Sequence, residues 1–510
     1  MIRNSFIKLS LVSALFIGGC TKDFEKVNVN PTSLTDLSTD ALFTRTQVDV
    51  SGGEYEAWRT NLIYTTQFVQ HFASTSWNQG DKYQFNEGYS AALWDAYYGS
   101  AIKNLVNLVE KTKGNAADVN YNSAARILKA FAFHRLTDLY GDVPYFEASK
   151  GFISGIFTPK YDAQKDILVD LIKELDEAAK AFDASKPFKG DITSANGNIA
   201  LWKKAAYSLM LRVSMRMTKA DAALAKDGAA KALAGGLMNA WNESFYIKHL
   251  PAVYDNPNSH VLGYYNGARL ELSSNSFKFS KTFIDLLKSN NDPRLKILSV
   301  VRTGAITSPV IGTEDDNVAI QKGLPSGLDA NTVPDPMSSY SQLRSDFAKA
   351  DAPNVLISHG QTQLLLAEAI ERGYVSGNAE ATFRSGVNSS INTWKLYGAP
   401  GSIFDDAAIN AFSAGVTYPA AGTLDQKLTA INTQYYIASL LDGYEPFANW
   451  RRSGVPSLTA VNYPGNYTNG VIPRRLQYPA SESGLNGANL SEAISRQGAN
   501  NFVTKVWWDK

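Results

Sequence analysis

Aromatic side chains interleaved with amides and carboxylates mark three loop segments of this sequence. The first, residues 71–83 (HFASTSWNQGDKY), contains Trp77, Asn78, Gln79, Asp81 and Tyr83. The same combination recurs further along the chain, where the candidate residues are Tyr254, Asn256, Tyr264, Tyr265, Asn266 and Tyr340. Such rings offer a flat apolar face beside a hydrogen-bonding rim. Two interpretations stay open for each ring: it stacks on a ligand, or it only holds a long loop in place.

Residues that could perform covalent chemistry are scattered. The histidines have no H-x-x-x-H spacing, which argues against a zinc site; they are His71, His134, His249, His260 and His359. No G-x-S-x-G, P-loop or G-x-G-x-x-G sequence follows a strand-like run, so acyl and phosphoryl transfer lose their usual support. The acidic run 314–316 lacks the alternation and the glycine of an EF-hand and is expected to be a solvated loop. We predict no catalysis, metal or cofactor, although a carboxylate pair for glycoside hydrolysis stays open because its spacing is spatial.

The only cysteine, Cys20, ends a short apolar segment that follows Arg3 and Lys8. That is the layout of a secretory signal, too short to span a bilayer. A signal that ends before a lone cysteine resembles the lipobox of bacterial lipoproteins, in which the sulfur receives a diacylglyceryl group. We therefore predict that residues 1–19 are a cleaved signal and that Cys20 is lipidated. The alternative is an ordinary signal peptide with a chance cysteine.

The composition excludes several classes of partner. The 510-residue chain has 49 Lys+Arg against 48 Asp+Glu, so no overall charge attracts nucleic acid or an anionic bilayer. This near-equal number of positive and negative residues suits a neutral ligand better than a highly charged one. Downstream of Cys20 no apolar run approaches the roughly 18 residues of a membrane helix, so the lipid would be the only anchor.

Helical periodicity dominates much of the chain. Apolar residues recur at three- to five-residue steps in several segments, and the predicted helices are 124–140, 162–182, 199–217, 354–372, 379–396 and 424–441. The first three begin about 37 residues apart. This spacing is close to the 34-residue tetratricopeptide unit, in which helix pairs bury a face only against neighbouring pairs.

The remaining segments predict the organisation of the chain. Residues 20–40 have few apolar residues and suit a tether, and order is expected from Ala41 within a single domain of residues 41–510. Helix pairs are expected mainly in 41–240 and 354–441. Between about 242 and 350, Asn, Ser, Gly and Pro cluster and periodicity fades, which indicates a loop-rich insert. Residues 444–510 form a C-terminal segment.

Several motifs, taken in order, point to one family. The N-terminal NVNP, the segment ARILKAFAFHRLTDLYGDVPY, and the later NDPR, LLLAEAIERG, IPRRLQYP and VWWD span nearly the whole mature chain. Their joint order and spacing resemble the SusD/RagB family of nutrient-binding outer-membrane lipoproteins.

This resemblance implies a fold, a ligand and a partner. The fold would be mostly α, with four tetratricopeptide-like helix pairs that support an irregular, loop-rich ligand-binding half. The protein would be anchored in the outer membrane, face the cell surface, and deliver an oligosaccharide to a SusC-like TonB-dependent barrel transporter without acting on it. Because sugars have apolar C–H faces and many hydroxyls, aromatic platforms flanked by polar side chains would form the site. Peptide cargo in the same architecture is the alternative, and an exported glycosidase is a third hypothesis.

The motifs that identify the family are expected to be structural. Asp138, Gly141, Asp142, Pro144 and Tyr145 lie at a predicted helix end, where glycine permits positive φ and proline stops the helix. In the later helix, Glu368 and Glu371 are expected on a face that is solvated or paired with Arg372. Trp507 and Trp508 are expected in the core.

Overall fold

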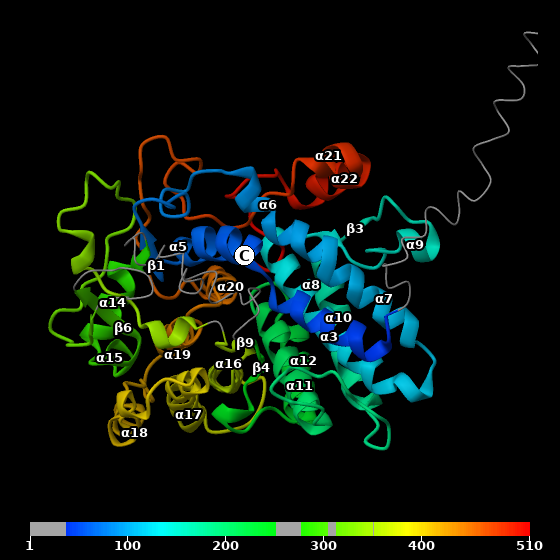
Figure 1. Ribbon diagram of the computed structural model, residues 1–510, viewed down its shortest axis with the longest axis horizontal. Helices are drawn as coiled ribbons and strands as arrows, with labels where there is room; N and C mark the ends of the chain where they lie inside the picture. The colour runs from blue at the N-terminus through cyan, green and yellow to red at the C-terminus, as the bar shows by residue number, and fades with distance from the viewer. Residues whose placement is uncertain (1–36, 251–276, 304–312, 350) are drawn as a thin grey trace, which may run out of the picture.

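The computed structural model describes residues 37–250, 277–303, 313–349 and 351–510. Helices dominate these residues and the strands are short (Figure 1). The helices before residue 250 are α3 (Thr39–Ser51), α4 (Glu54–Glu56), η1 (Ala57–Thr65), α5 (Thr66–Phe68), α6 (Glu87–Ala96), η2 (Tyr97–Ala101), α7 (Ile102–Thr112), η3 (Ala116–Asp118), α8 (Val119–Tyr140), α9 (Gly151–Ser154), α10 (Gln164–Ala181), α11 (Ile199–Arg216), α12 (Ala222–Gly235) and η4 (Trp241–Glu243). The later helices are α14 (Lys281–Ser289), α15 (Arg294–Leu298), η5 (Met337–Ser339), η6 (Ser345–Ala348), α16 (His359–Glu371), α17 (Ala379–Asn392), η7 (Thr393–Tyr397), η8 (Gly401–Ile403), α18 (Asp406–Gly415), α19 (Leu424–Ala438), α20 (Tyr444–Ser453), α21 (Ser481–Leu485) and α22 (Gly487–Gln497).

Neighbouring helices pack in succession. Helix α8 packs on α7 and α10, α11 on α10 and α12, and α16 on α11, α17 and α19. Figure 1 shows α7, α8, α10, α11 and α12 to the right of and below the centre, α16, α17 and α19 to the lower left, and α20 near the middle. The prediction of a mostly helical chain with tetratricopeptide-like pairs is confirmed. No helix among the described residues is long and apolar enough to cross a membrane.

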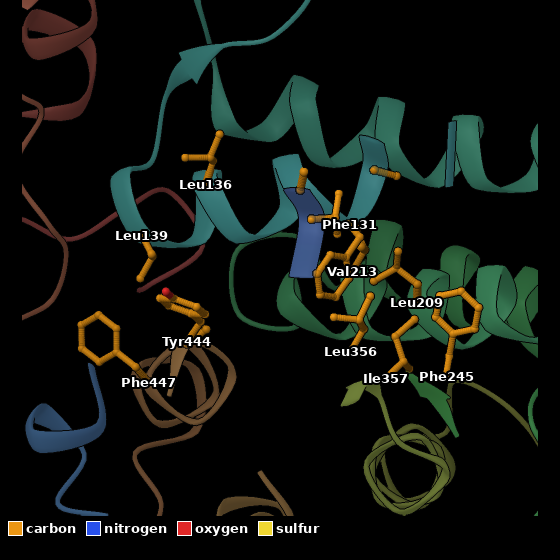
Figure 2. Close-up of a cluster of buried hydrophobic side chains, with 14 of the residues drawn as sticks. Phe131, Leu136, Leu139, Leu209, Val213, Phe245, Leu356, Ile357, Tyr444 and Phe447 are labelled. Atoms are coloured by element: carbon orange, nitrogen blue, oxygen red, sulfur yellow. The ribbon is translucent and has the colours of Figure 1, made fainter. Parts of the chain in front are cut away.

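The core lies where the helical pairs meet the C-terminal segment. In Figure 2, Phe131 of α8 lies close to Leu209 and Val213 of α11, whereas Leu136 and Leu139 lie further along α8, toward Tyr444. All of these residues are buried. Helix α20 contributes further apolar side chains, and so do two strands; those that Figure 2 labels are Tyr444, Phe447, Phe245, Leu356 and Ile357. Small alanines on α8 permit this close packing of helices, because they leave room for neighbouring side chains.

The strands form small antiparallel ribbons rather than one large sheet. They are β1 (Phe72–Ser74), β2 (Val143–Pro144), β3 (Tyr161–Asp162), β4 (Phe245–Ile247), β5 (Phe277–Phe279), β6 (Ser299–Thr303), β7 (Thr313–Asp315), β8 (Gln342–Leu343) and β9 (Asn354–Ile357). The pairings are β1 with β5, β2 with β3, β4 with β9, and β6 between β7 and β8. Each ribbon joins segments that are distant in sequence or flank a loop.

Several boundaries differ from the sequence-based predictions. Helix α8 begins at Val119, five residues earlier than predicted, and the regular 37-residue interval between helix starts is therefore not kept. Residues 354–357 are strand β9 and not helix, because they pair with β4. The helix then starts behind Ser358, whose hydroxyl accepts from the Gln361 amide in a capping box. Order also begins earlier than Ala41, since α3 starts at Thr39.

The region 242–350 is more regular than predicted. Its described part holds helices α14 and α15 and the three-stranded sheet β7-β6-β8. The acidic run 314–316 is not a solvated loop, since Glu314 pairs with Arg302 at 2.8 Å and Asp316 with Arg344 at 2.7 Å. The sequence did not predict these ion pairs, because the arginine partners lie in other strands and turns.

Buried ion pairs cross-link the helical half. Glu368 is fully buried and not solvated: its carboxylate accepts from Arg452 Nη2 at 2.7 Å and from Arg372 Nε at 2.8 Å. Burial opposes the charged form of Glu368, but Arg452 and Arg372 outweigh it and lower the pKa to about 2. The predicted pairing of Glu368 with Arg372 is confirmed. The sequence did not predict the second partner, Arg452, which comes from α20 and covers Glu368 from solvent.

Candidate binding site

The predicted loop 71–83 emerges between α5 and α6, on the side of the molecule opposite α9 (Figure 1). Its base is the ribbon of β1 and β5, in which Phe72 stands opposite Phe279 with ring centroids 5.0 Å apart. Beyond this base, residues 75–86 form the segment that we call the Trp77 loop. The ribbon fixes the point at which this loop leaves the core.

The Trp77 loop is held from inside by side chains that bond to its backbone. Gln67 donates to the Trp77 carbonyl at 2.7 Å and accepts from the Asp81 amide at 2.9 Å. Asn78 donates to the carbonyls of Thr75 at 3.1 Å and Leu328 at 3.3 Å. These bonds satisfy backbone groups that would otherwise be unpaired inside the protein, so the loop has a defined shape.

Gly80 permits the closest approach in the loop. A Cβ placed at this residue would lie 2.0 Å from the carbonyl oxygen of Ile63 and 2.8 Å from the Gln67 Cβ. No real side chain tolerates such a distance to backbone, so glycine is required for the loop to lie against η1.

Asp81 is buried at the foot of the loop. One of its carboxylate oxygens accepts from the Ser74 amide at 2.7 Å. Burial raises the pKa of Asp81 to about 8, because a charged carboxylate is poorly solvated there. The loop therefore carries a carboxyl group that is largely protonated at neutral pH.

Two tryptophans form the accessible aromatic surface at this loop. Trp77 is 39% exposed and its ring meets that of Trp58 edge to face, with centroids 5.5 Å apart and planes at 75°. Trp58 also contacts the buried ring of Phe277 at 5.5 Å. Trp58 and Arg59 lie at the start of η1, and Tyr55 lies in the preceding α4. The guanidinium carbon of Arg59 is 4.3 Å from the centroid of the Tyr55 ring.

Trp58, Tyr55 and Arg59 were missed in the sequence. The run EYEAWR at 54–59 has aromatic and charged residues together, which was the available signal. Helix η1 is a π-helix, and π-helical turns are found frequently at functional sites. The structure thus adds Trp58 to the candidate residues.

The other predicted residues are buried, lie beside Trp77 in the loop, or fall outside the described residues. Asp81, Tyr83 and Tyr340 are buried and have internal partners, so their side chains support loops and do not face a ligand in this conformation. Tyr83 accepts from the Val461 amide at 3.1 Å, and Tyr340 donates to Asp335 at 3.2 Å.

Asn78 is buried and Gln79 is half-buried, and both follow Trp77 directly in the loop. Tyr254, Asn256, Tyr264, Tyr265 and Asn266 lie outside the described residues, as does Cys20. The structure does bring the first and third segments together, because Tyr340 packs with Ala73 at the loop base.

Cross-links extend from the loop to the C-terminal segment. Lys82 pairs with Asp329 and lies 4.3 Å above the ring of Tyr463. Tyr463 in turn donates to Asp329 at 3.0 Å. The Trp77 loop, the 325–340 segment and the 456–470 segment are therefore joined to one another through Lys82, Asp329 and Tyr463.

One cluster elsewhere has the composition of a metal site. Ligand atoms of His134, Asp138 and Glu445 lie within 4.8 Å of one another, and this is the one such group among the residues that the structure describes. The guanidinium of Arg216 lies 3.1 Å from Asp138 and 2.6 Å from Glu445, and Arg212 lies 3.8 Å from Glu445, so fixed cations already occupy the surroundings of both carboxylates. Burial lowers the pKa of His134, which keeps the imidazole neutral. The cluster is best explained as a buried ionic network.

The motif residues that were expected to be structural have structural partners. Helix α8 ends at Tyr140 and is followed by Gly141, whose φ is 85°, and Asp142 pairs with Arg496 at 2.6 Å. Tyr145 donates to Asp170 at 2.8 Å. Trp508 is fully buried, as predicted, whereas Trp507 is only partly buried.

Comparisons with known proteins agree with this architecture. The family model described as "SusD-like_2: Starch-binding associating with outer membrane" matches residues 31–479. A solved structure titled "chitin-binding protein" is 33% identical, with a TM-score of 0.82, and the match covers 93% of this chain and all of that one. A second, "Bacteroidetes AC2a SusD-like", is 25% identical with a TM-score of 0.82 over 93% of this chain and all of that one. A chitin-binding SusD homolog from Flavobacterium johnsoniae, 23% identical with a TM-score of 0.76 over 92% of this chain and 98% of that one, shares the fold. No curated protein sequence is similar to the chain.

The family model covers most of the sequence, and the structural matches span nearly the full length of their own chains. Paired helices, a loop-bearing face with exposed tryptophan and the order of the sequence motifs all lead to the same assignment: the chain belongs to the SusD-like family.

Proposed function

We propose that this protein is a non-catalytic, surface-facing lipoprotein that captures oligosaccharide and delivers it to a SusC-like TonB-dependent transporter in the outer membrane. The binding of oligosaccharide is proposed from the contact between the rings of Trp58 and Trp77. Trp77 is 39% exposed, and internal hydrogen bonds hold the loop that carries it. An aromatic face beside amides suits the apolar C–H face and the hydroxyls of a sugar. Membership of a family described as starch-binding supports the same class of ligand.

N-acetylglucosamine oligomers are the first ligands to test, because a relative that is 33% identical is titled chitin-binding. Starch-type oligosaccharides and short peptides complete the panel, and peptide binding alone would favour the alternative cargo. Calorimetry should detect binding by the wild type, and Trp77→Ala should weaken it by about 1–3 kcal/mol, as for loss of a central aromatic contact.

Phe152→Ala is the matched control for Trp77→Ala, since Phe152 is an exposed ring on the opposite side of the molecule. The control should leave affinity unchanged. If Trp77→Ala lowers the melting temperature but not the affinity, then the ring is structural and residues 254–266 become the leading site. Release of shorter sugars from incubated polysaccharide would support the glycosidase hypothesis instead.

Anchoring through Cys20 is a separate part of the proposal. Cys20→Ala removes the site of lipidation and should move the protein from the membrane pellet to the soluble fraction. The acyl chains attached at Cys20 are the anchor in this proposal, and several such chains together are needed for stable attachment. A variant that still pellets after a carbonate wash would contradict this anchor.

A further inference from the structure

Trp507 borders a cavity near the C-terminal end of the chain. The sequence predicted this ring in the core, but it is only partly buried. The cavity has a volume of about 360 Å³, within the range of roughly 300–1,000 Å³ that small-ligand pockets occupy. Its lining comes from Asp142, the start of α10, the end of α22 and residues 505–510. We call this space the Trp507 cavity.

The walls of the Trp507 cavity are held by hydrogen bonds between segments that are far apart in sequence. The Asp142 carboxylate accepts from Arg496 Nε at 2.6 Å and from the Gln164 amide at 2.8 Å. Gln497 in turn accepts from the Asp142 amide at 2.7 Å. These bonds join the end of α22 to the start of α10, so the cavity has a fixed shape, which lowers the entropy cost of binding a ligand.

Basic side chains outnumber acidic ones in the lining of the cavity. Both acidic side chains are already paired, Asp142 with Arg496 at 2.6 Å and Asp509 with Arg474 at 2.8 Å. Lys505 is exposed and pairs with no carboxylate among the residues that the structure describes. The cavity therefore has a local surplus of positive charge, although the chain as a whole is nearly neutral.

The groups next to the cavity are basic as well. Burial lowers the pKa of Lys219, which is close to Lys505. Asp509 opposes this change, but the positive charges of Arg474 and Lys505 lower the pKa of Lys219 further. Cations are thus close enough to repel one another here, and a bound anion would relieve that repulsion.

Lys165 places a second positive charge beside the aromatic ring. Its Nζ lies 5.9 Å from the centroid of the Trp507 ring. The side chain of Lys165 is 47% exposed and pairs with Asp221 at 3.1 Å, and such exposed pairs are weak enough for a ligand to compete. A flat ring suits the apolar C–H face of a sugar, and a cation next to it can bind a charged substituent of the same sugar.

We propose that the Trp507 cavity is a second ligand site and that it binds an acidic saccharide, such as an oligomer of a uronic acid. The ring of Trp507 contacts the C–H face of one sugar, and Lys505 and Lys165 bind its carboxylate. The choice of a saccharide among possible anions rests on the proposed function. The site itself does not, because none of the lining residues belongs to the Trp77 loop.

Calorimetry on the full chain tests this site, with the trisaccharide of galacturonic acid as the probe. The methyl ester of this trisaccharide is the matched control ligand, since it has the same sugar rings without the charge. The acid should bind at least about tenfold more tightly than the ester, and a rise in ionic strength should weaken the binding of the acid alone. Equal affinity for the acid and the ester would overturn the proposal.

Two variants locate the bound acid. Lys505→Glu reverses an exposed charge and should weaken binding at least about tenfold at an unchanged melting temperature. Trp507→Ala removes the aromatic face and should weaken binding by a similar factor. Lys231→Glu, at an exposed lysine of α12 outside the lining, is the matched control and should leave affinity unchanged. Unchanged affinity in Lys505→Glu would overturn the proposal even if Trp507→Ala disturbs folding.

Further outcomes separate this site from the Trp77 loop. Trp77→Ala should leave binding of the acid unchanged, and loss of that binding would place the acid at the Trp77 loop and overturn the second site. If neutral oligosaccharides fail to bind while binding of the acid still depends on Lys505, only the site proposed at Trp77 is overturned.

A peptide of three glutamates tests whether charge alone is recognised. It should bind at least about tenfold more weakly than the galacturonic acid trisaccharide, because it lacks the C–H face of a sugar ring. Equal affinity for the two would overturn the assignment of a saccharide to the Trp507 cavity.

Discussion

The Trp77 loop and the apolar surface around α9, which exposes Phe152, Phe157 and Leu485 and which we call the Phe152 surface, both expose aromatic rings, but their surroundings differ. Around Trp77, buried amides and a carboxyl bond to the loop backbone, and a second ring meets the first edge to face. Around Phe152, the neighbours are apolar, and a cavity opens between them. The comparison teaches that ring exposure alone does not indicate the kind of partner, because the groups beside an exposed ring can be polar, as at Trp77, or apolar, as at Phe152.

Both surfaces depend on the same helical half, so a change in its buried charges should affect both at once. Glu368→Ala leaves Arg452 buried without its main partner and should lower the free energy of unfolding by about 3–5 kcal/mol. Urea denaturation measures this loss. Glu380→Ala removes an exposed pair with Arg384 and should cost less than about 1 kcal/mol. Similar losses of unfolding free energy in Glu368→Ala and Glu380→Ala would contradict the prediction that the buried ion pair of Glu368 contributes more to stability.

Substitutions at two glycines, one in each surface, should have different effects on stability and glycan binding. Gly80→Ala forces a Cβ against the Ile63 carbonyl and should lower the free energy of unfolding by about 1–3 kcal/mol and reduce glycan affinity. At Gly155, in the Phe152 surface, a Cβ meets no atom within 4 Å, but φ is +71°, so Gly155→Ala should cost about 1 kcal/mol through backbone strain. Thermal unfolding and calorimetry on both variants test this difference. Loss of glycan binding in Gly155→Ala would break the separation of the two surfaces.

A pair of asparagines offers a finer comparison. Asn78→Ala removes the bonds to Thr75 and Leu328 and should lower stability by about 1–2 kcal/mol, with weaker glycan binding. Asn486→Ala removes the bond to Pro159 and should lower stability by about 1 kcal/mol, with glycan binding unchanged. If Asn486→Ala weakens glycan binding, then the two surfaces are coupled.

The smallest expected effect is a pH dependence of the Trp77 loop. The pKa of Asp81 is raised in the folded protein to about 8, above its unfolded value of 3.8, so the folded state binds the proton more tightly. The resulting stability is fully present below about pH 4 and is lost as pH rises through about 8. Between pH 7 and 9, wild type should therefore lose roughly 1 kcal/mol relative to Asp81→Asn, which cannot ionise.

Tryptophan fluorescence and denaturation at each pH measure the Asp81 effect. A matching change in Asp81→Asn would assign the pH dependence to another group. In acid the sign is opposite for Glu368, whose pKa is lowered to about 2: its contribution is lost only as pH falls through that value.

The helical half was largely predictable because its signal is local. The predicted helices 162–182 and 199–217 match α10 and α11 within two residues at each end. Periodic apolar residues define such helices whatever lies around them. By contrast, residues 354–357 continued an apolar pattern yet form a strand, because pairing with β4 outweighs local preference.

The candidate site was only partly predictable. The composition of residues 71–83 identified the loop and its exposed Trp77, but the same composition could not distinguish the buried Asp81 and Tyr83 from ligand contacts. Trp58 belongs to a helix that precedes the loop, and its contact with Trp77 depends on how η1 packs. Sequence patterns give the types of residue, whereas burial is a property of the packed chain.

The sequence by itself determined the family, the helical class and the absence of a recognisable catalytic motif, because ordered motifs, apolar period and spacing are all written along the chain. Only the tertiary structure decided which charges are buried, that Glu368 meets Arg452 from another helix, and that Phe152 stands beside a cavity. The physical reason is that ion pairs, edge-to-face rings and cavities join residues far apart in sequence. Their distances are set by the packing of whole helices and loops.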